Sequence, residues 1–299
     1  KGFNVGSGGE LRLDANRGNV RIVTGGTGVA VEVKRIARTD DRDDAAELFR
    51  DHEIAFEQSG NDVIIRSRSK HQQGWLNWND GDKLRVQWNI RVPANYSVNL
   101  KTSGGSIEVT DLSGKLEART SGGGIEAGRI TGPVTAHTTG GSIEIKSATG
   151  DVDAETSGGS IELGDIRGTI DAHTSGGSIH VESVNGDVTV RTSGGNIRIE
   201  NAGGSIEAHT SGGSVNARFT QQPRGDSHLS SSGGSVNVRL APSVGATIDA
   251  QSSGGGIDTD IPVSVMGKQS RGSLSGTING GGPRLVLRSS GGGINLTRD

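Results

Sequence analysis

The residues with the clearest potential for chemistry form a repeated Thr-Ser-Gly-Gly corner, first seen in TSGGSIEV at residues 102–109. Paired glycines beside hydroxyl side chains are typical of loops that bind phosphate through backbone N–H groups. Such a loop also needs a lysine followed by serine or threonine at the start of a helix. Here a strand-like apolar alternation follows the glycines, and no lysine stands at the required place. The corner is therefore predicted to be structural.

A second candidate is a column of glutamates on the outer face of the repeat: Glu108, Glu126, Glu144 and Glu162. Carboxylates stacked about 4.8 Å apart repel one another, so they favour a cation or basic neighbours. In calcium-binding nonapeptide repeats the carboxylate lies within the turn, whereas these turns carry serine. Two alternatives follow, a solvated face of mixed charge and a ladder stabilised by calcium.

Three histidines, His137, His173 and His209, also recur at one constant spacing. Two coils separate successive members, which places their Cα atoms about 9.6 Å apart. Zinc requires nitrogens about 2.0 to 2.1 Å from one centre. We therefore predict surface histidines, no metal site and no bound cofactor.

The segment GWLNWNDG at residues 74–81 contains two of the three tryptophans, Trp75 and Trp78. An exposed indole ring suits contact with a glycan or a protein pocket. The alternative is that both rings cover the open end of the fold. Trp88, in register with apolar neighbours, is predicted to lie in the core. The tripeptide at 224–226, Arg-Gly-Asp, is interpreted as a chance match in a loop.

Composition limits the classes of protein that the chain can belong to. The 299 residues include 51 glycines, more than twice the usual share of about 7%, and only 3% are aromatic. With regular apolar spacing, this favours a thin, repetitive β structure over disorder. A formal charge of −3 argues against nucleic acid as a partner. Cysteine is absent, which excludes disulfides, and no apolar run of about 18 residues is present to span a membrane.

The elements that must position these side chains are short strands with a period of nine residues. An aliphatic residue recurs at every ninth position: Val98, Ile107, Leu116, Ile125, Val134, Ile143, Val152, Ile161, Ile170, Ile179, Val188, Ile197, Ile206 and Val215. The Gly-Gly corner appears at every second strand, so the full repeat contains two strands and two unlike corners. Hairpins in a meander are one alternative, but identical columns favour a parallel β-solenoid with about 18 residues per coil.

The alternation of a strand places the threonine of each corner on the core face. Leu116, Ala118 and Thr120 share one face, while Glu117 and Arg119 point outward. We therefore expect an inward ladder of threonine hydroxyls, which argues against an outward, ice-binding array. The corner glycines are expected to supply backbone conformations that a Cβ atom would forbid.

The less regular part of the chain is predicted at residues 1–97, before regular coils at 98–299, within one elongated solenoid domain over 1–299. Leu11, Val20 and Val29 are nine residues apart, so coils are expected from near the N-terminus. Residues 40–50 indicate a short helix with acidic residues in its first turn. Residues 54–58 and 63–68 indicate a hairpin, and 84–92 a further strand. Strands near 285–287 and 294–296 predict a last coil that ends near Asp299 without a cap.

The order and spacing of these features carry a family resemblance. An initial strand pair, a helix and hairpin, a strand ending Ile90-Arg91-Val92-Pro93, and ten Gly-Gly corners, the last three after short insertions, follow one another. The chain resembles the bacterial putative adhesin family of β-strand-repeat proteins, also called toast-rack domains, of unknown function. The resemblance covers nearly the whole chain and implies a non-enzymatic module that is exported or faces outward from the membrane. It supplies no catalytic motif.

The sequence thus predicts a scaffold or adhesin-like module of the cell envelope or extracellular space that presents side-chain ladders to a surface protein or glycan. An alternative is a filament subunit, because uncapped coils can pair end to end in a homo-oligomer. A third is a polysaccharide-cleaving enzyme, since two glutamates of the column could reach the separation of a retaining glycosidase. No loop beside them is long enough to form a cleft, so we expect no enzyme and no catalytic residue.

Overall fold

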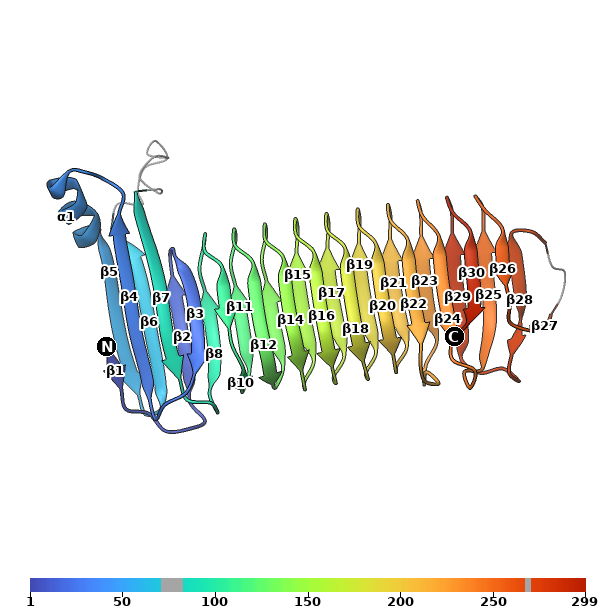
Figure 1. The fold of residues 1–299 in the computed structure, drawn as a ribbon, viewed down its shortest axis with the longest axis horizontal. Helices are drawn as coiled ribbons and strands as arrows, with labels where there is room; N and C mark the ends of the chain where they lie inside the picture. Colours follow the sequence, from blue (N-terminus) through green and yellow to red (C-terminus); the bar gives the residue numbers. More distant parts are fainter. Residues whose placement is uncertain (71–82, 267–269) are drawn as a thin grey trace. The chain divides into compact units, whose positions relative to one another are not determined.

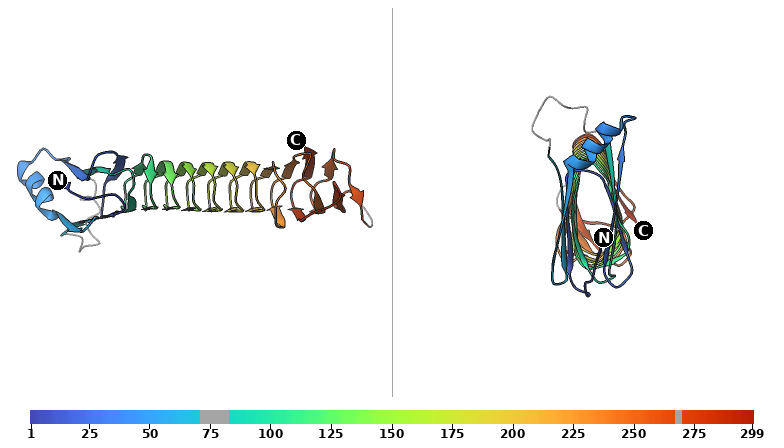
Figure 2. Two further views of the ribbon diagram at one scale, coloured as in Figure 1. Left: turned by 90° about the horizontal axis from the view of Figure 1, so that it is seen from below. Right: turned by 90° about the vertical axis from the view of Figure 1, so that its left-hand side faces the viewer.

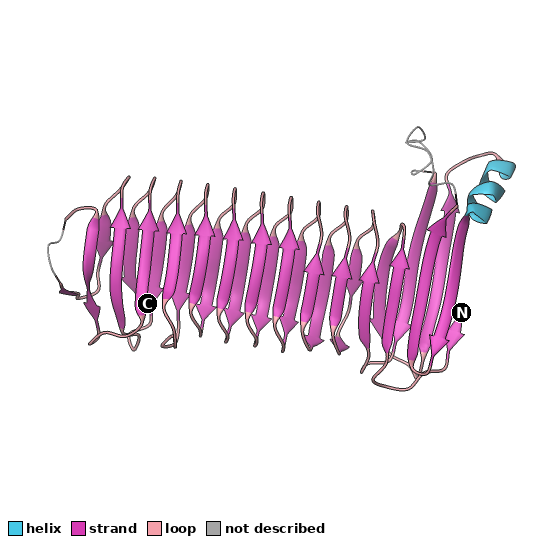
Figure 3. Ribbon diagram, turned by 180° about the vertical axis from the view of Figure 1, so that it is seen from behind, coloured by secondary structure: helices cyan, strands magenta, loops and turns pink. Residues whose placement is uncertain are grey.

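The structure is a computed structural model that describes residues 1–70, 83–266 and 270–299. The chain forms two compact units, Lys1–Gly141 and Ser142–Asp299, called unit 1 and unit 2. Both are built almost entirely of strands (Figure 3). The predicted all-β solenoid class is confirmed. The prediction of a single domain stays a prediction.

Unit 1 has one helix and thirteen strands among its described residues. The helix is α1 (Arg42–Asp51). The strands are β1 (Gly2–Phe3), β2 (Glu10–Ala15), β3 (Asn19–Thr24), β4 (Val29–Ala37), β5 (His52–Ser59), β6 (Asp62–Ser69), β7 (Leu84–Val92), β8 (Ser97–Lys101), β9 (Ile107–Val109), β10 (Leu112–Ser113), β11 (Leu116–Arg119), β12 (Ile125–Thr131) and β13 (Val134–His137).

The strands of unit 1 form two sheets. One has the order β1-β4-β7-β3-β9-β12, with β10 also paired to β12, and the other has the order β13-β11-β8-β2-β6-β5. The inner coils pair in parallel with a register of one full repeat, as in Leu116 opposite Val134. The N-terminal strands differ, because β4 runs antiparallel to β7 and β5 antiparallel to β6. The coil expected near the N-terminus is present in β2 and β3, which contain Leu11 and Val20 and pair in parallel, whereas Val29 begins an antiparallel strand.

Helix α1 and the hairpin β5–β6 confirm the insertion predicted near the N-terminus. The Asp41 side chain caps the helix by accepting hydrogen bonds from the backbone N–H groups of Asp43 and Asp44. Those two acidic residues lie in the first turn and Arg50 in the last, which matches the helix dipole. Figure 2 shows the helix beside the first strands of unit 1.

Unit 2 has seventeen strands among its described residues. They are β14 (Ile143–Ala148), β15 (Val152–Thr156), β16 (Ile161–Ile166), β17 (Ile170–Thr174), β18 (Ile179–Val184), β19 (Val188–Thr192), β20 (Ile197–Ala202), β21 (Ile206–Thr210), β22 (Val215–Phe219), β23 (Ser227–Ser231), β24 (Val236–Leu240), β25 (Ala246–Ser252), β26 (Ile257–Thr259), β27 (Ser264–Val265), β28 (Ser273–Ile278), β29 (Arg284–Ser289) and β30 (Ile294–Arg298).

Successive strands of unit 2 alternate between two parallel sheets, so each coil contributes one strand to each sheet (Figures 1 and 2). Ile161 lies opposite Ile179 in one sheet and Ile170 opposite Val188 in the other, again one full repeat apart. Alternate side chains are buried between the sheets. An apolar residue at the second corner of each coil is buried as well: Leu112 and Ile130 in unit 1, and Ala148, Ile166, Val184 and Ala202 in unit 2.

The far end of unit 2 departs from chain order. Strand β29 lies between β23 and β25, and β30 lies between β24 and β26 (Figure 1). Beyond them β25 pairs antiparallel with β28, and β28 with β27. The last strands in the sequence are thus internal, and an antiparallel turn of chain closes this end. The prediction of an uncapped last coil near Asp299 is wrong, because β25, β26, β27 and β28 precede β29 and β30 in the sequence but lie beyond them in the sheets.

The second glycine of each corner is required by close packing of stacked backbones. A Cβ atom on Gly177 would lie 2.1 Å from the carbonyl oxygen of Gly159, whereas one on Gly176 would lie 3.1 Å from that of Gly158. Neither Gly176 nor Gly177 has a positive φ. The expectation that these glycines adopt special backbone angles is therefore wrong, and steric contact between coils is the reason for them.

The threonine column is buried, as its parity predicts. The Thr192 hydroxyl donates to the Gly177 carbonyl at 2.8 Å and accepts from the Gly195 N–H at 3.3 Å. Thr174 and Thr210 make the corresponding bonds to Gly159 and Gly195. Each hydroxyl therefore satisfies glycine backbone groups at the corner rather than a neighbouring threonine.

Candidate functional site

Outward side chains of unit 2 line two surface grooves, one on each sheet. The arginine–asparagine groove has a volume of about 350 Å³ and lies over β20, β22, β24 and β30. It is lined by Arg198, Asn216, Arg218, Asn237, Arg239 and Asn295. The serine–histidine groove has a volume of about 410 Å³ and lies over β15, β17, β19 and β21. It is lined by Ser157, His173, Ser175, Arg191, Ser193 and His209.

The three asparagines of the first groove form an ordered amide ladder. They are opposite one another in register on β22, β24 and β30. The Asn295 Nδ2 donates to Asn237 Oδ1 at 2.6 Å, and the Asn237 Nδ2 donates to Asn216 Oδ1 at 2.8 Å. Every amide has at least one further N–H group and one further lone pair. The ladder therefore offers donors and acceptors in fixed positions.

The arginines of this groove have unequal environments. Arg218 donates to Asp299, with an Nε to Oδ1 distance of 2.7 Å, and to Asn201, and the bond to Asp299 raises the Arg218 pKa. Arg198 lies 2.8 Å from the Glu200 carboxylate. Hydrogen bonds from Arg198 and then from His180 lower the pKa of Glu200.

Arg239 is the third arginine, and its side chain is exposed. It stands between Arg218 and Thr297 in register. Among the described residues of the chain, no carboxylate lies within ion-pair distance of its guanidinium. The N–H groups of the Arg239 guanidinium are therefore available to a ligand in the groove.

Two basic side chains of the serine–histidine groove contact carboxylates beside it. The His173 Nε2 lies 2.7 Å from Asp171 Oδ1, and Arg191 contacts Glu207. His209 Nδ1 is 2.9 Å from the Ser230 hydroxyl. Exposed serines of successive corners also line this groove. This groove presents hydroxyl and imidazole groups with little net charge.

Residues after the Gly-Gly pair have a structural role that sequence reasoning missed. The Ser160 hydroxyl accepts from the Ser178 N–H at 3.2 Å, and the Ser178 hydroxyl accepts from the Asn196 N–H at 3.0 Å. The Asn196 side chain continues the series to the Ser214 N–H at 2.8 Å. The available signal was the repeated serine or asparagine at this position, which glycine replaces in three corners, at 124, 256 and 293.

The predicted glutamate column is described in two parts. In unit 1, Glu126 is opposite Glu108, and Glu108 lies 3.3 Å from Arg21. In unit 2, Glu144 is opposite Glu162, whose other neighbour in register is His180. Basic side chains thus adjoin the carboxylates, as the solvated-face alternative expects. No cluster of three metal-ligating side chains occurs in the described part of the chain.

The other candidates from the sequence have different outcomes. Trp75 and Trp78 lie outside the described residues. His173 and His209 lie two strands apart, on β17 and β21, so they do not converge. Asp226 of the Arg-Gly-Asp tripeptide accepts a hydrogen bond from the Arg284 N–H at 2.8 Å, so its carboxylate fixes a turn.

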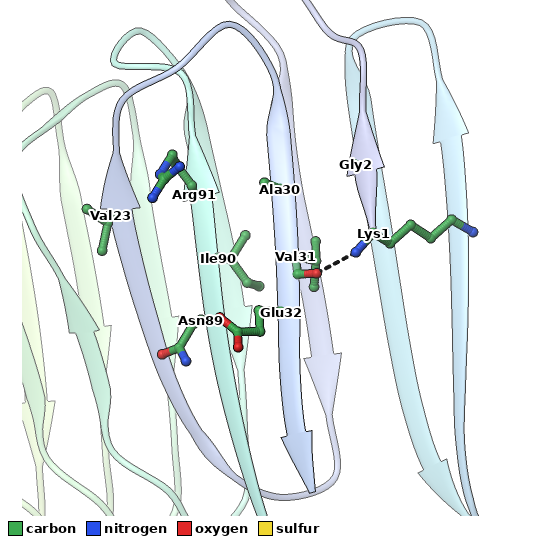
Figure 4. A pocket seen from close by; sticks show the side chains of 9 residues that line it. All are labelled: Lys1, Gly2, Val23, Ala30, Val31, Glu32, Asn89, Ile90 and Arg91. Carbon is green, nitrogen blue, oxygen red and sulfur yellow. Dashed lines mark hydrogen bonds between the residues drawn. The ribbon is translucent and has the colours of Figure 1, made fainter.

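A hollow of about 370 Å³ lies on the outer face of unit 1 over β3, β4 and β7. Figure 4 shows Arg91, Asn89 and Glu32 around it, with the Lys1 backbone nitrogen donating to the Val31 carbonyl at 2.7 Å. Its acid, base and amide groups select no single class of ligand.

A buried polar cluster lies inside unit 1. The ring of His52 is 3% exposed, its Nε2 is 2.8 Å from the Ser67 hydroxyl, and its centroid is 6.4 Å from that of Trp88. Burial, followed by the charges of Arg35 and Arg17, lowers the His52 pKa to about 4. Because Ser67 is also buried, this pair is closed to a substrate. Trp88 itself is fully buried, as predicted.

Comparisons with known proteins identify a family. A family model described as Toastrack DUF4097 matches residues 9–297. A solved structure described as a "putative cell adhesion protein" from Clostridium sporogenes is 12% identical, with a TM-score of 0.21, over 99% of this chain and 95% of that one. A "putative adhesin" from Bacteroides fragilis is also 12% identical, with a TM-score of 0.33, over 100% and 95%. No curated protein matches the chain.

Proposed function

Because the chain belongs to the Toastrack DUF4097 family, we propose that it is a non-enzymatic, adhesin-like scaffold of the cell envelope or extracellular space. Its function is to hold polar side chains at a regular spacing, where they can contact a glycan or a surface protein. The observation that carries the proposal is the pair of grooves on unit 2, each lined by outward side chains of successive coils. Many weak contacts along such a face sum to a useful affinity.

Several features of the grooves favour binding over catalysis. Both lie on the regular surface of the sheets rather than within a cleft built by long loops. The perturbed carboxylate beside the first groove, Glu200, has a lowered pKa, whereas a general acid needs a raised one. The Ser67–His52 pair is buried.

No helix among the described residues is long and apolar enough to cross a membrane.

Binding measurements on immobilised protein test this function. A panel of neutral and acidic polysaccharides, together with envelope protein extracts, is passed over the surface, and reducing ends are measured in the recovered polysaccharides. We expect retention of at least one class of partner without new reducing ends. The variant Asn237→Ala should weaken retention, whereas Asn185→Ala, an exposed corner asparagine outside both grooves, should not. New reducing ends that disappear in Glu126→Gln would show an enzyme instead.

The filament alternative receives less support from the sheet ends. In unit 2 the outermost strands β26 and β27 have three and two residues. Edge strands this short offer few backbone groups for pairing. We therefore expect a monomer by size-exclusion chromatography with light scattering, and fibres seen by negative-stain microscopy would favour the filament.

A further inference from the structure

Charge distinguishes the arginine–asparagine groove from the rest of the molecule. The whole chain has a formal charge of −3, yet the groove lining contains three arginines and a single carboxylate, that of Glu200. Asp299 balances Arg218, which leaves Arg239 as the uncompensated cation. A ligand that enters this groove gains from carrying negative charge.

The unpaired guanidinium indicates which negative group fits. A guanidinium presents a planar fork of donors that matches the two oxygens of a carboxylate. Arg218 already makes this arrangement with Asp299, donating through both Nε and Nη2. Arg239 is opposite Arg218 in register on the next strand, on the same face of the sheet, and lacks an acid. An external carboxylate would complete the pattern.

The amide ladder indicates what the carboxylate is attached to. Asn216, Asn237 and Asn295 are held by one another, so their remaining N–H groups and lone pairs are preorganised for partners that both donate and accept. Sugar hydroxyls are such partners. The apolar residues beneath, Ala217 and Val238, are buried, so the groove offers no exposed surface for apolar peptide side chains.

We propose that the arginine–asparagine groove binds an acidic polysaccharide, with a uronate carboxylate on Arg239 and sugar hydroxyls on the asparagine ladder. This rests on the proposed function and specifies its ligand. The serine–histidine groove is less suited to the same ligand, because Asp171 and Glu207 already contact His173 and Arg191. The chain would run across the strands, from Asn216 towards Asn295, along the direction in which the coils repeat.

Calorimetric titration with galacturonate oligomers tests the proposal on the full chain, with dextran and polyglutamate as comparison ligands. We expect the oligomers to bind, with dextran binding at least tenfold more weakly. Arg239→Gln should weaken binding about tenfold, and Arg239→Lys should restore part of it because charge returns without the fork. Arg167→Gln, at an exposed arginine outside both grooves, is the matched control and should leave affinity unchanged, with the melting temperature of each variant confirming an intact fold.

Three results would overturn the proposal, and each bears differently on the general function. Equal binding of dextran, unaffected by Arg239→Gln, would leave a glycan-binding scaffold whose ligand is neutral. Binding of polyglutamate as tight as that of the oligomers would make the groove a site for acidic peptides. Absence of binding to all three probes would exclude an acidic polysaccharide as the ligand. Retention of an envelope protein on the immobilised protein would still support the scaffold function.

Discussion

Replacing each glycine of one corner by alanine tests why the repeat contains two of them. In the corner at 176–177 the added methyl group meets different surroundings. On Gly177 it would lie 2.1 Å from the Gly159 carbonyl oxygen and 2.4 Å from its carbon, and on Gly176 the nearest atom would be 3.1 Å away. The first distance is far inside van der Waals contact, and the second is only tight.

The expected cost follows from the movement needed. Relief of the contact at Gly177 requires adjacent coils to separate by roughly 1 Å, and overpacking of this kind costs about 1–3 kcal/mol. The separation also stretches the backbone bond from Gly176 N–H to the Ser157 carbonyl, now 2.9 Å, at about 1 kcal/mol. Gly177→Ala should therefore lower the free energy of unfolding by about 3 kcal/mol. Gly176→Ala should change it by less than about 1 kcal/mol, because reduced freedom of the unfolded chain offsets a small strain.

Thermal unfolding followed by circular dichroism compares the two variants with the parent protein. For a unit of this size, about 3 kcal/mol corresponds to a fall in melting temperature of about 6–12 °C. Because repeats can unfold in parts, hydrogen exchange of peptides spanning 157–178 should show the loss concentrated at this corner. Equal effects of the two substitutions, or a larger effect of Gly176→Ala, would refute the steric explanation.

Four further predictions concern other positions. The free energy of unfolding should be at its full value above pH 6.5 and should fall by up to about 3 kcal/mol towards pH 4. The reason is that the histidine takes up a proton in the unfolded state, whereas in the folded state the pKa of His52 is lowered to about 4. Urea midpoints should show this dependence on pH for the parent protein and a weaker one for His52→Gln. Thr192→Val should cost about 1–3 kcal/mol by leaving the Gly177 carbonyl unpaired, whereas Thr192→Ser should retain most of the stability in the same urea titration. Ser160→Ala should cost about 1 kcal/mol through loss of the Ser178 N–H bond, read from the same midpoints. If the glutamate column binds calcium, the ion should raise the melting temperature and Glu126→Gln should abolish the rise; an unchanged melting temperature would leave the solvated face.

The fold could be predicted from local periodicity, because each coil contacts mainly the coils one period away. The spacing of Leu116 and Val134, one full repeat, is the observed register, and the same rule placed Thr192 inside. The reason for the corner glycines could not be read in this way. Special φ angles and close packing both require glycine, and only the coordinates of the neighbouring coil at Gly159 distinguish them.

The arginine–asparagine groove could not be predicted for a topological reason. The stretch of chain between Asn237 and Asn295 is not a whole number of repeats. The regular spacing of the repeat therefore assigns these two residues to different columns, although they are opposite each other in register. Arg218 and Asp299 are separated in the same way, yet they form an ion pair. The serine–histidine groove was accessible, since the outward sequence Glu155, His173, Arg191, His209 follows directly from strand parity, but a column alone shows no concavity.

The insertion of β29 and β30 between earlier strands has a consequence for synthesis of the chain. Strands β23 and β24 emerge from the ribosome with one side unpaired, and their partners on that side are residues 284–298. Until then β25 also lacks its parallel neighbour. The earlier coils of unit 2 can assemble in the order of translation, one on the next. The final coils can form only after this late segment has been synthesised. Until then β23 and β24 expose unpaired edges, which are the part of the nascent chain most in need of a chaperone.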